Sequence, residues 1–190
     1  FVGTGCYYVH LAEGQARILL ARQSVDDLLA QTDTKPDLER QLRLVESARR
    51  FAAQIGLEVG GQYTSYLPWP GDRIVTTVVA TAPGEIDATP FRFPIVGRVP
   101  YKGFFDRAAA EAEAQRLSRR GFDVCLFAVH AYSTLGWMDD PVTGPMLRSG
   151  DGELVETLVH ELVHATVFVK SQPDFNEGVA AFIGEETAVR

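Results

Sequence analysis

The residues most capable of metal binding and catalysis are His160, Glu161 and His164, which form an H-E-x-x-H motif. In a helix, residues four apart lie on one face, so the two imidazoles can hold one metal ion between them. Glu161 can then reach a metal-bound water and act as its general base. Two histidines, a carboxylate third ligand and an open position are typical of a hydrolytic Zn²⁺ site. The motif therefore predicts metal-assisted hydrolysis.

The stretch around the motif, ELVETLVHELVHATVFV at residues 153–169, predicts a buried helix. Its polar side chains share one sector of a helical wheel, and nearly all the others are apolar. The sector contains Glu153, Glu156, Thr157, His160, Glu161 and His164. The alternative is a core helix whose histidines only hydrogen-bond to neighbours, since buried polar groups need a partner in either case.

Glu177 is the candidate third ligand, with twelve residues between it and His164. A break at residues 171–174 separates the first helix from a second apolar-periodic segment at 175–183, which can fold back over the histidines. An alternative is a capping box, with Asp174 as N-cap and Glu177 at the third helical position. Glu185 and Glu186 are the other downstream carboxylates that could serve as the ligand.

Composition and charge limit the protein class. The 190 residues, 46% hydrophobic and 23% charged, suffice for a single domain over 1–190, with a helical part at 1–56 and the sheet and zinc helices at 57–190. The net charge of −7 argues against a nucleic-acid partner. No apolar run has the length needed to span a bilayer.

The remaining elements predict an α+β fold with a small mixed or antiparallel sheet. Two helices, at 11–30 with a possible restart at Ser24 and at 36–55, predict an N-terminal helical hairpin. Strands are expected at 73–81, 91–96 and 123–130, the last one buried, and Asp106 should cap a helix that runs to Arg120.

The two cysteines have different expected roles. Cys125 lies in the apolar stretch DVCLFAVH and is expected to be a small core residue. Cys6 follows the small residues of FVGTG, which look like the tail of a bacterial lipoprotein signal, so Cys6 is the expected lipidation site. A disulfide between the two has no support in the sequence.

Several stretches together resemble a bacterial family of predicted aminopeptidases that are zinc-dependent lipoproteins. They are residues 5–8, 14–15, 94–103, 131–137 and 139–141, the H-E-x-x-H motif, and Phe175-Asn176-Glu177. The N-E-G pattern at Glu177 also resembles the third-ligand segment of gluzincin metallopeptidases. The resemblance implies a zincin-like fold, a zinc peptidase site, export, and a lipid anchor on Cys6 at the periplasmic side of the cell envelope.

The sequence thus predicts a zinc-dependent peptidase, aminopeptidase-like, that acts on peptides or proteins. The oxyanion needs a donor besides zinc, for which Tyr132 is the first candidate and His130 the second. Loop packing is the alternative role for Tyr132 and Trp137. Carboxylates available for a substrate α-ammonium are Asp139, Asp140, Glu185 and Glu186.

One rival function is a zinc-stabilised binding or assembly protein of the cell envelope without turnover. Another is a metal-free structural protein with a decayed site, against which the intact Glu161 argues.

Overall fold

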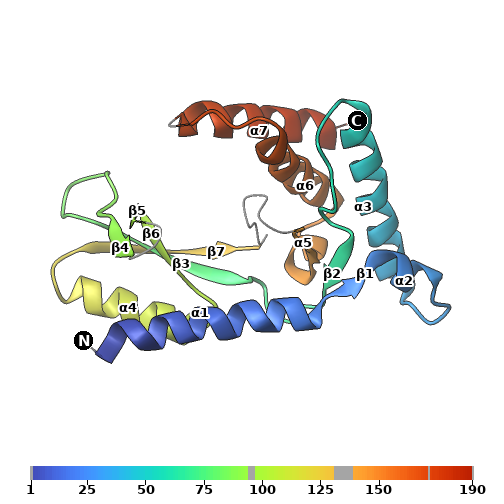
Figure 1. The fold of residues 1–190 in the computed structure, drawn as a ribbon. Helices are drawn as coiled ribbons and strands as arrows, with labels where there is room; N and C mark the ends of the chain where they lie inside the picture. Colours follow the sequence, from blue (N-terminus) through green and yellow to red (C-terminus); the bar gives the residue numbers. More distant parts are fainter. Residues whose placement is uncertain (1, 94–96, 131–138, 171, 190) are drawn as a thin grey trace. The chain divides into compact units, whose positions relative to one another are not determined.

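The structure is a computed structural model that describes residues 2–93, 97–130, 139–170 and 172–189. The chain forms two compact units, each built from two separate stretches (Figure 1). Unit 1 contains Phe1–Leu20 and Asp72–His130, and unit 2 contains Ala21–Gly71 and Ala131–Arg190. The predicted α+β class is confirmed. The single-domain assignment stays a prediction.

In its described residues, unit 1 contains two helices and antiparallel strands in two separate sheets. Its elements are α1 (Val2–Ala21, ending just past the unit boundary), β3 (Val75–Thr81), β4 (Phe91–Phe93), β5 (Gly97–Val99), β6 (Tyr101–Phe104), α4 (Arg107–Ser118) and β7 (Asp123–Val129). The strand order is β6-β3-β7, and β4 pairs with β5 separately. Val78 of β3 lies opposite Lys102 of β6 and Leu126 of β7.

The core of unit 1 lies between the sheet and α4. Burial alternates along β3, as expected for a strand with one covered face. Val78 and Ala80 pack with Phe104 of β6 and with Leu117 of α4. Asp106 caps α4 as predicted, because its carboxylate accepts hydrogen bonds from the first backbone N–H groups of the helix.

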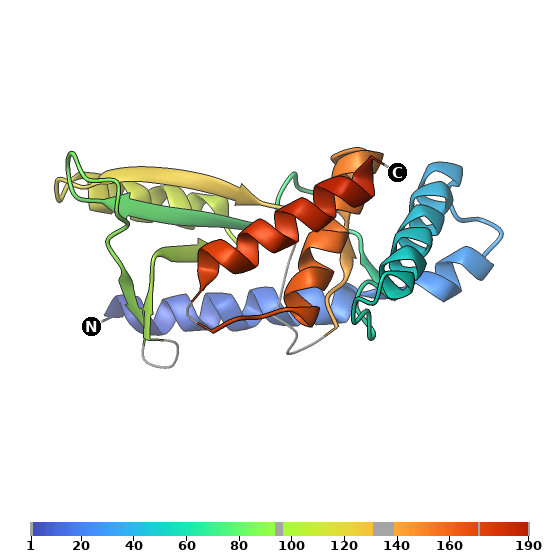
Figure 2. The ribbon, with the colours of Figure 1, turned by 90° about the horizontal axis from the view of Figure 1, so that it is seen from above.

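Unit 2 is mostly helical. Its elements are β1 (Gln23–Ser24), α2 (Val25–Ala30), α3 (Pro36–Gln54), β2 (Ser65–Leu67), β8 (Val142–Thr143), α5 (Gly144–Arg148), α6 (Asp151–Thr166) and α7 (Pro173–Ala188). β2 pairs antiparallel with β1 and parallel with β8. α6 packs against α3 and against α7, which crosses over it (Figure 2).

The core of unit 2 lies between α3 and α6. The buried stripe of α3 includes Leu42 and Val45, and it meets Leu154, Leu158 and other apolar residues of α6. This stripe agrees with the helical periodicity predicted for 36–55. α6 therefore rests on a buried apolar face, while its polar sector remains available for chemistry.

The prediction of an N-terminal helical hairpin is wrong for its first helix. The predicted helix at 11–30 is two helices, α1 and α2, separated by β1. The restart at Ser24 is confirmed, because its Oγ accepts a hydrogen bond from the N–H of Asp27 at 3.2 Å. α1 belongs to unit 1, whereas α2 packs on α3 within unit 2.

The prediction of a buried strand at 123–130 is also wrong. β7 is largely exposed, with Leu126 at 42% and Phe127 at 52%. Cys125 is a free, exposed thiol and not a core residue. The physical reason is position, since β7 pairs only with β3, at the edge of its sheet among the described strands.

In the described part of the chain, the helices are all too short or too polar to cross a membrane.

Candidate metal centre

The H-E-x-x-H residues lie on α6, in its last two turns. The helix follows Gly150, whose φ of 106° suits glycine, and ends before the extended Val167. Leu158 and Leu162 face the core, whereas the side chains of His160 and His164 keep exposures of 25% and 16%. The apolar face therefore anchors the helix, and the imidazoles stay accessible to an ion.

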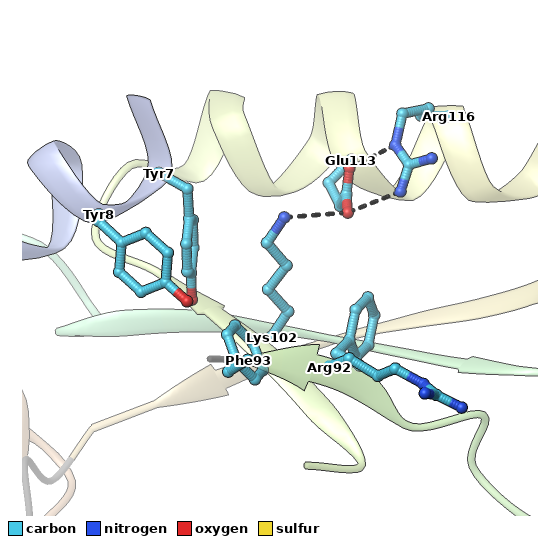
Figure 3. A pocket seen from close by; sticks show the side chains of 8 residues that line it. Tyr7, Tyr8, Arg92, Phe93, Lys102, Glu113 and Arg116 are labelled. Atoms are coloured by element: carbon cyan, nitrogen blue, oxygen red, sulfur yellow. Dashed lines mark hydrogen bonds and ion pairs between the residues drawn. The ribbon is translucent and has the colours of Figure 1, made fainter. Parts of the chain in front are cut away.

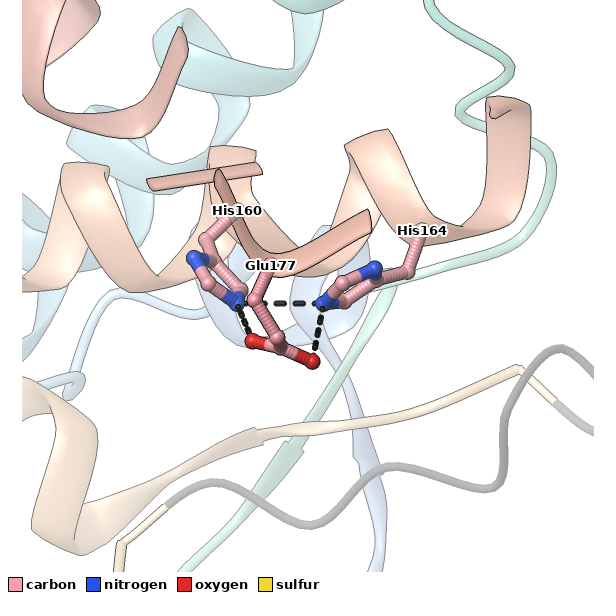
Figure 4. A group of neighbouring side chains, drawn as sticks. All are labelled: His160, His164 and Glu177. Carbon is pink, nitrogen blue, oxygen red and sulfur yellow. Dashed lines mark hydrogen bonds and ion pairs between the residues drawn. The ribbon is translucent and has the colours of Figure 1, made fainter. Parts of the chain in front are cut away.

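The two imidazoles face one another. Nε2 of His160 and Nε2 of His164 are 3.1 Å apart, and the rings meet edge to face with centroids 4.8 Å apart (Figure 4). Two ring nitrogens at this distance need a shared proton or a shared cation between them, because two lone pairs repel. The one-turn spacing along α6 produces this pair directly.

Glu177 brings a carboxylate from α7 to the same point. Its Oε2 is 3.4 Å from Nε2 of His160, and its Oε1 is 3.5 Å from Nε2 of His164. Figure 4 shows the carboxylate facing both rings. The structure thus brings together the three side chains that the sequence nominated as ligands.

The three side chains fit a zinc ion. Their ligand atoms all lie within 4.8 Å of one another. Tetrahedral bonds of about 2.05 Å place ligand atoms about 3.3 Å apart, close to the distances of 3.1 to 3.5 Å seen here. Two imidazoles and one carboxylate are the donor set typical of catalytic zinc sites, in which the fourth position is left for water or substrate. The Glu177 side chain is 66% exposed, which leaves solvent access on its side.

Asn176 holds the connection between the two helices. Its side chain is buried, donates a hydrogen bond to the carbonyl of Val169 at 3.0 Å and accepts one from the Val169 N–H at 2.9 Å. These two bonds tie the start of α7 to the segment that leaves α6. Glu177 is therefore oriented by its own neighbour in the sequence.

The capping-box alternative for Glu177 is wrong. α7 begins at Pro173 after the N-cap Gln172, with no side-chain cap hydrogen bond, so Asp174 is already inside the first turn. Proline at the first helical position suits such a start, because its missing N–H would have no helical partner there.

Gly184 allows α7 to approach α6 closely. A Cβ at this position would lie 2.9 Å from the backbone oxygen of Glu156 and 3.5 Å from Cβ of His160. The sequence reasoning missed Gly184 and the role of Asn176. A glycine inside an apolar helical pattern was the available signal for the close approach.

Tyr63 is a further residue near the motif that sequence reasoning missed. It is 3% exposed and has a positive φ of 60°. Burial raises the pKa of its phenol well above the usual value, and the negative charges of Glu161 and Asp140 raise it further. The phenol therefore stays protonated, within electrostatic reach of the expected general base. The Tyr63 N–H donates to the carbonyl oxygen of Asp140 at 2.7 Å, which joins this loop to the segment before β8.

The other nominated residues have varied positions. Tyr132 and Trp137 lie outside the described residues. His130 follows β7 in unit 1 and is exposed, and Cys6 lies in α1. The four candidate ammonium-binding carboxylates differ in burial: Asp140 is 3% exposed, and Asp139, Glu185 and Glu186 are exposed. Among the described residues, Glu185 and Glu186 are not part of the possible ligand cluster.

Comparison with known proteins identifies the family. Residues 6–190 match the family described as "Putative aminopeptidase". The chain belongs to this family, and the family resemblance found in the sequence is confirmed to that extent. Neither the curated proteins nor the solved structures contain a match.

Proposed function

We propose that this protein is a zinc-dependent peptidase that removes N-terminal residues from peptides. The observation that supports it most is the convergence of His160, His164 and Glu177, whose ligand atoms lie within 4.8 Å of one another. Membership of the aminopeptidase family agrees with peptide hydrolysis as the reaction class.

In this proposal, His160, His164 and Glu177 hold the Zn²⁺. When bound, the ion supplies a Lewis acid that polarises a peptide carbonyl and lowers the pKa of water to about 7. The Glu161 carboxylate accepts a proton from the attacking water and delivers it to the nitrogen of the leaving amine. The buried, protonated Tyr63 adds no competing negative charge beside Glu161.

Substrate binding needs two further groups. A free α-ammonium pairs with a carboxylate, and the exposed Asp139, Glu185 and Glu186 of unit 2 are better placed for this than the buried Asp140. The proposed oxyanion donor is Tyr132. Tyr132→Phe is expected to lower turnover by roughly ten- to a thousandfold while zinc content stays the same.

The proposal places the enzyme at the periplasmic side of a bacterial cell envelope, with a lipid on Cys6. Small residues precede this cysteine, and the sequence resembles a lipoprotein family. Intact-mass analysis of detergent-extracted protein should show the lipid on the wild type and none on Cys6→Ser. A wild-type mass with an unmodified thiol would contradict this location.

The decisive experiment compares Glu161→Gln with Glu153→Gln. Both residues lie on α6, but Glu153 is exposed in the first turn, so it is the matched control. Glu161→Gln should keep one zinc per chain and lose at least about a hundredfold in turnover of aminoacyl-coumarin substrates. The control should keep both zinc and turnover.

Metal content and turnover distinguish the proposal from its rivals. A full zinc complement in His160→Ala would contradict the ligand assignment. If the wild type binds zinc but cleaves no member of a broad aminoacyl panel, the non-enzymatic envelope function is favoured. Equal turnover of Glu161→Gln and wild type would remove Glu161 from the mechanism.

A further inference from the structure

Unit 1 contains a cavity of about 420 Å³ that the proposed peptidase reaction does not use (Figure 3). Residues of α1, α4, β4 and β6 line it, all from unit 1, whereas the metal centre lies in unit 2. Its volume falls within the range of small-molecule sites, roughly 300 to 1,000 Å³. The chemistry of its lining indicates what it can bind.

One side of the cavity carries a partly buried charge cluster. Glu113 of α4 accepts hydrogen bonds from Nζ of Lys102 at 3.2 Å and from Nε and Nη2 of Arg116 at 2.7 and 2.9 Å. The hydrogen bonds from Arg116 and the charge of Lys102 lower the pKa of Glu113, although burial opposes them. Glu113 is therefore ionised, and it already accepts three N–H groups.

The cluster has more positive than negative charge. Lys102, Arg116 and Arg92 line the cavity with a single carboxylate, that of Glu113, so its lining carries two net positive charges. Glu113 uses one N–H group of the ammonium and two of the five of the Arg116 guanidinium. The Arg116 side chain is 51% exposed, so further N–H groups can turn to a ligand. A site of this kind favours an anion with planar oxygens.

Aromatic rings form the other walls. Tyr7 lies 5.6 Å from Tyr8 and 6.0 Å from Phe93, measured between ring centroids, and Phe91 also lines the space. Tyr7 donates its hydroxyl to the carbonyl of Gly103 at 3.0 Å, which fixes the ring. Burial raises its pKa to about 12, so it adds no charge. These walls suit a flat or branched apolar group.

Lys102 joins the two sides of the cavity. Its ammonium lies 4.5 Å from the centre of the Tyr7 ring and 5.2 Å from that of Phe104, and it also pairs with Glu113. The aromatic contacts hold the ammonium at the boundary between the charged and apolar walls. A ligand whose acid group is next to an apolar side chain would match this boundary.

We propose that unit 1 binds an organic carboxylate of up to about dipeptide size, in which an apolar or aromatic group adjoins the acid. Lys102 and Arg116 pair with the carboxylate, and Tyr8 and Phe93 pack against the apolar group. A bare phosphate would satisfy the cations but leave the aromatic walls unfilled. The site is independent of the proposed zinc chemistry.

The test is calorimetric titration of the full chain with N-acetyl-phenylalanine. N-Acetyl-phenylalanine amide lacks the charge, acetate lacks the apolar group, and inorganic phosphate tests the anion alone. The acid should bind at least about tenfold more tightly than each of the three, because each lacks one half of the recognition. The same titration of His160→Ala should give an unchanged affinity.

Variants locate the site. Arg116→Gln and Phe93→Ala should each weaken binding of the acid by about tenfold, through the charge and the aromatic wall respectively. Arg107→Gln is the matched control, because Arg107 lies on the same helix, pairs with Glu111 and does not line the cavity. Circular dichroism and two-dimensional NMR spectra verify that each variant is folded.

Three results would overturn the proposal. They are equal affinity for the acid and its amide, binding of phosphate as tight as binding of the acid, and absence of binding at millimolar acid. If Arg116→Gln folds like the wild type and binds as tightly, the carboxylate does not occupy this cavity. Likewise, if Phe93→Ala folds and binds the acid as tightly as the wild type, the apolar group does not occupy this cavity. This second variant leaves the ion pairs of Glu113 intact.

Discussion

Gly184 offers the sharpest test of how α6 and α7, the two helices of the proposed zinc site, are held together. A Cβ added there would lie 2.9 Å from the backbone oxygen of Glu156 and 3.4 Å from its Cγ. Non-bonded contacts of real Cβ atoms are essentially never shorter than 3.0 Å, and a helix carbonyl cannot rotate away. In Gly184→Ala, α7 must therefore move away from α6.

The expected cost follows from two opposing terms. Overpacking a close helix contact destabilises by about 1–3 kcal/mol. Alanine gains about 0.5–1 kcal/mol over glycine inside a helix. Gly184→Ala should therefore lower the free energy of unfolding by about 1 kcal/mol, within limits of about 0 and 2.5 kcal/mol. Glu177 lies seven residues earlier on the same face of α7, so the movement also displaces its carboxylate, and zinc affinity should fall about tenfold or more.

Gly178→Ala is the matched control. Gly178 is on the same helix, next to Glu177, and an added Cβ would meet nothing within 4 Å. This variant should be more stable than wild type by about 0.5–1 kcal/mol and should retain zinc. Urea unfolding measures the stability, and competition with a chromophoric chelator measures the zinc affinity. If Gly184→Ala is stabilised as much as Gly178→Ala with unchanged zinc affinity, the close approach of the helices is refuted.

Three further predictions concern the inter-helix connection, the metal and pH. Asn176→Ala should lower the free energy of unfolding by about 2 kcal/mol in urea, because the backbone N–H and carbonyl of Val169 lose their partners, and an unchanged value would contradict this role. Zinc at a hundredfold excess over its Kd should stabilise the protein by about 2.7 kcal/mol, so EDTA should lower the Tm, and an identical Tm with and without chelator would argue against a bound metal. The pKa of Glu113 is lower in the folded state than its value of 4.5 in the unfolded chain. The ionised carboxylate therefore stabilises the folded state above about pH 4.5, and this stabilisation is lost as pH falls through the folded-state pKa. Glu113→Gln should flatten the decline in stability below about pH 4.5, as followed by circular dichroism, and an unaltered pH profile would exclude a folded-state shift.

The sequence by itself determined the features that depend on neighbours along the chain. The spacing of His160 and His164 places both imidazoles on one helix face, whatever the rest of the fold. The start of α3 at Pro36 and the cap of α4 at Asp106 follow from backbone preferences at helix ends. The apolar stripe of α3 likewise follows from its 3.6-residue periodicity.

Only the tertiary structure decided the features that depend on distant residues. The spacing after His164 and the apolar periodicity that follows nominated Glu177, but its distance from the histidines depends on the Asn176 connection and on the space at Gly184. Cys125 shows the opposite case, since an apolar stretch predicts burial but the edge position of β7 leaves it exposed. The nearness of Tyr63 to Glu161 also has no local signal, because about a hundred residues separate them. Local preferences act through adjacent dihedral angles, whereas packing depends on which surfaces meet. No short stretch of the sequence specifies which surfaces those are.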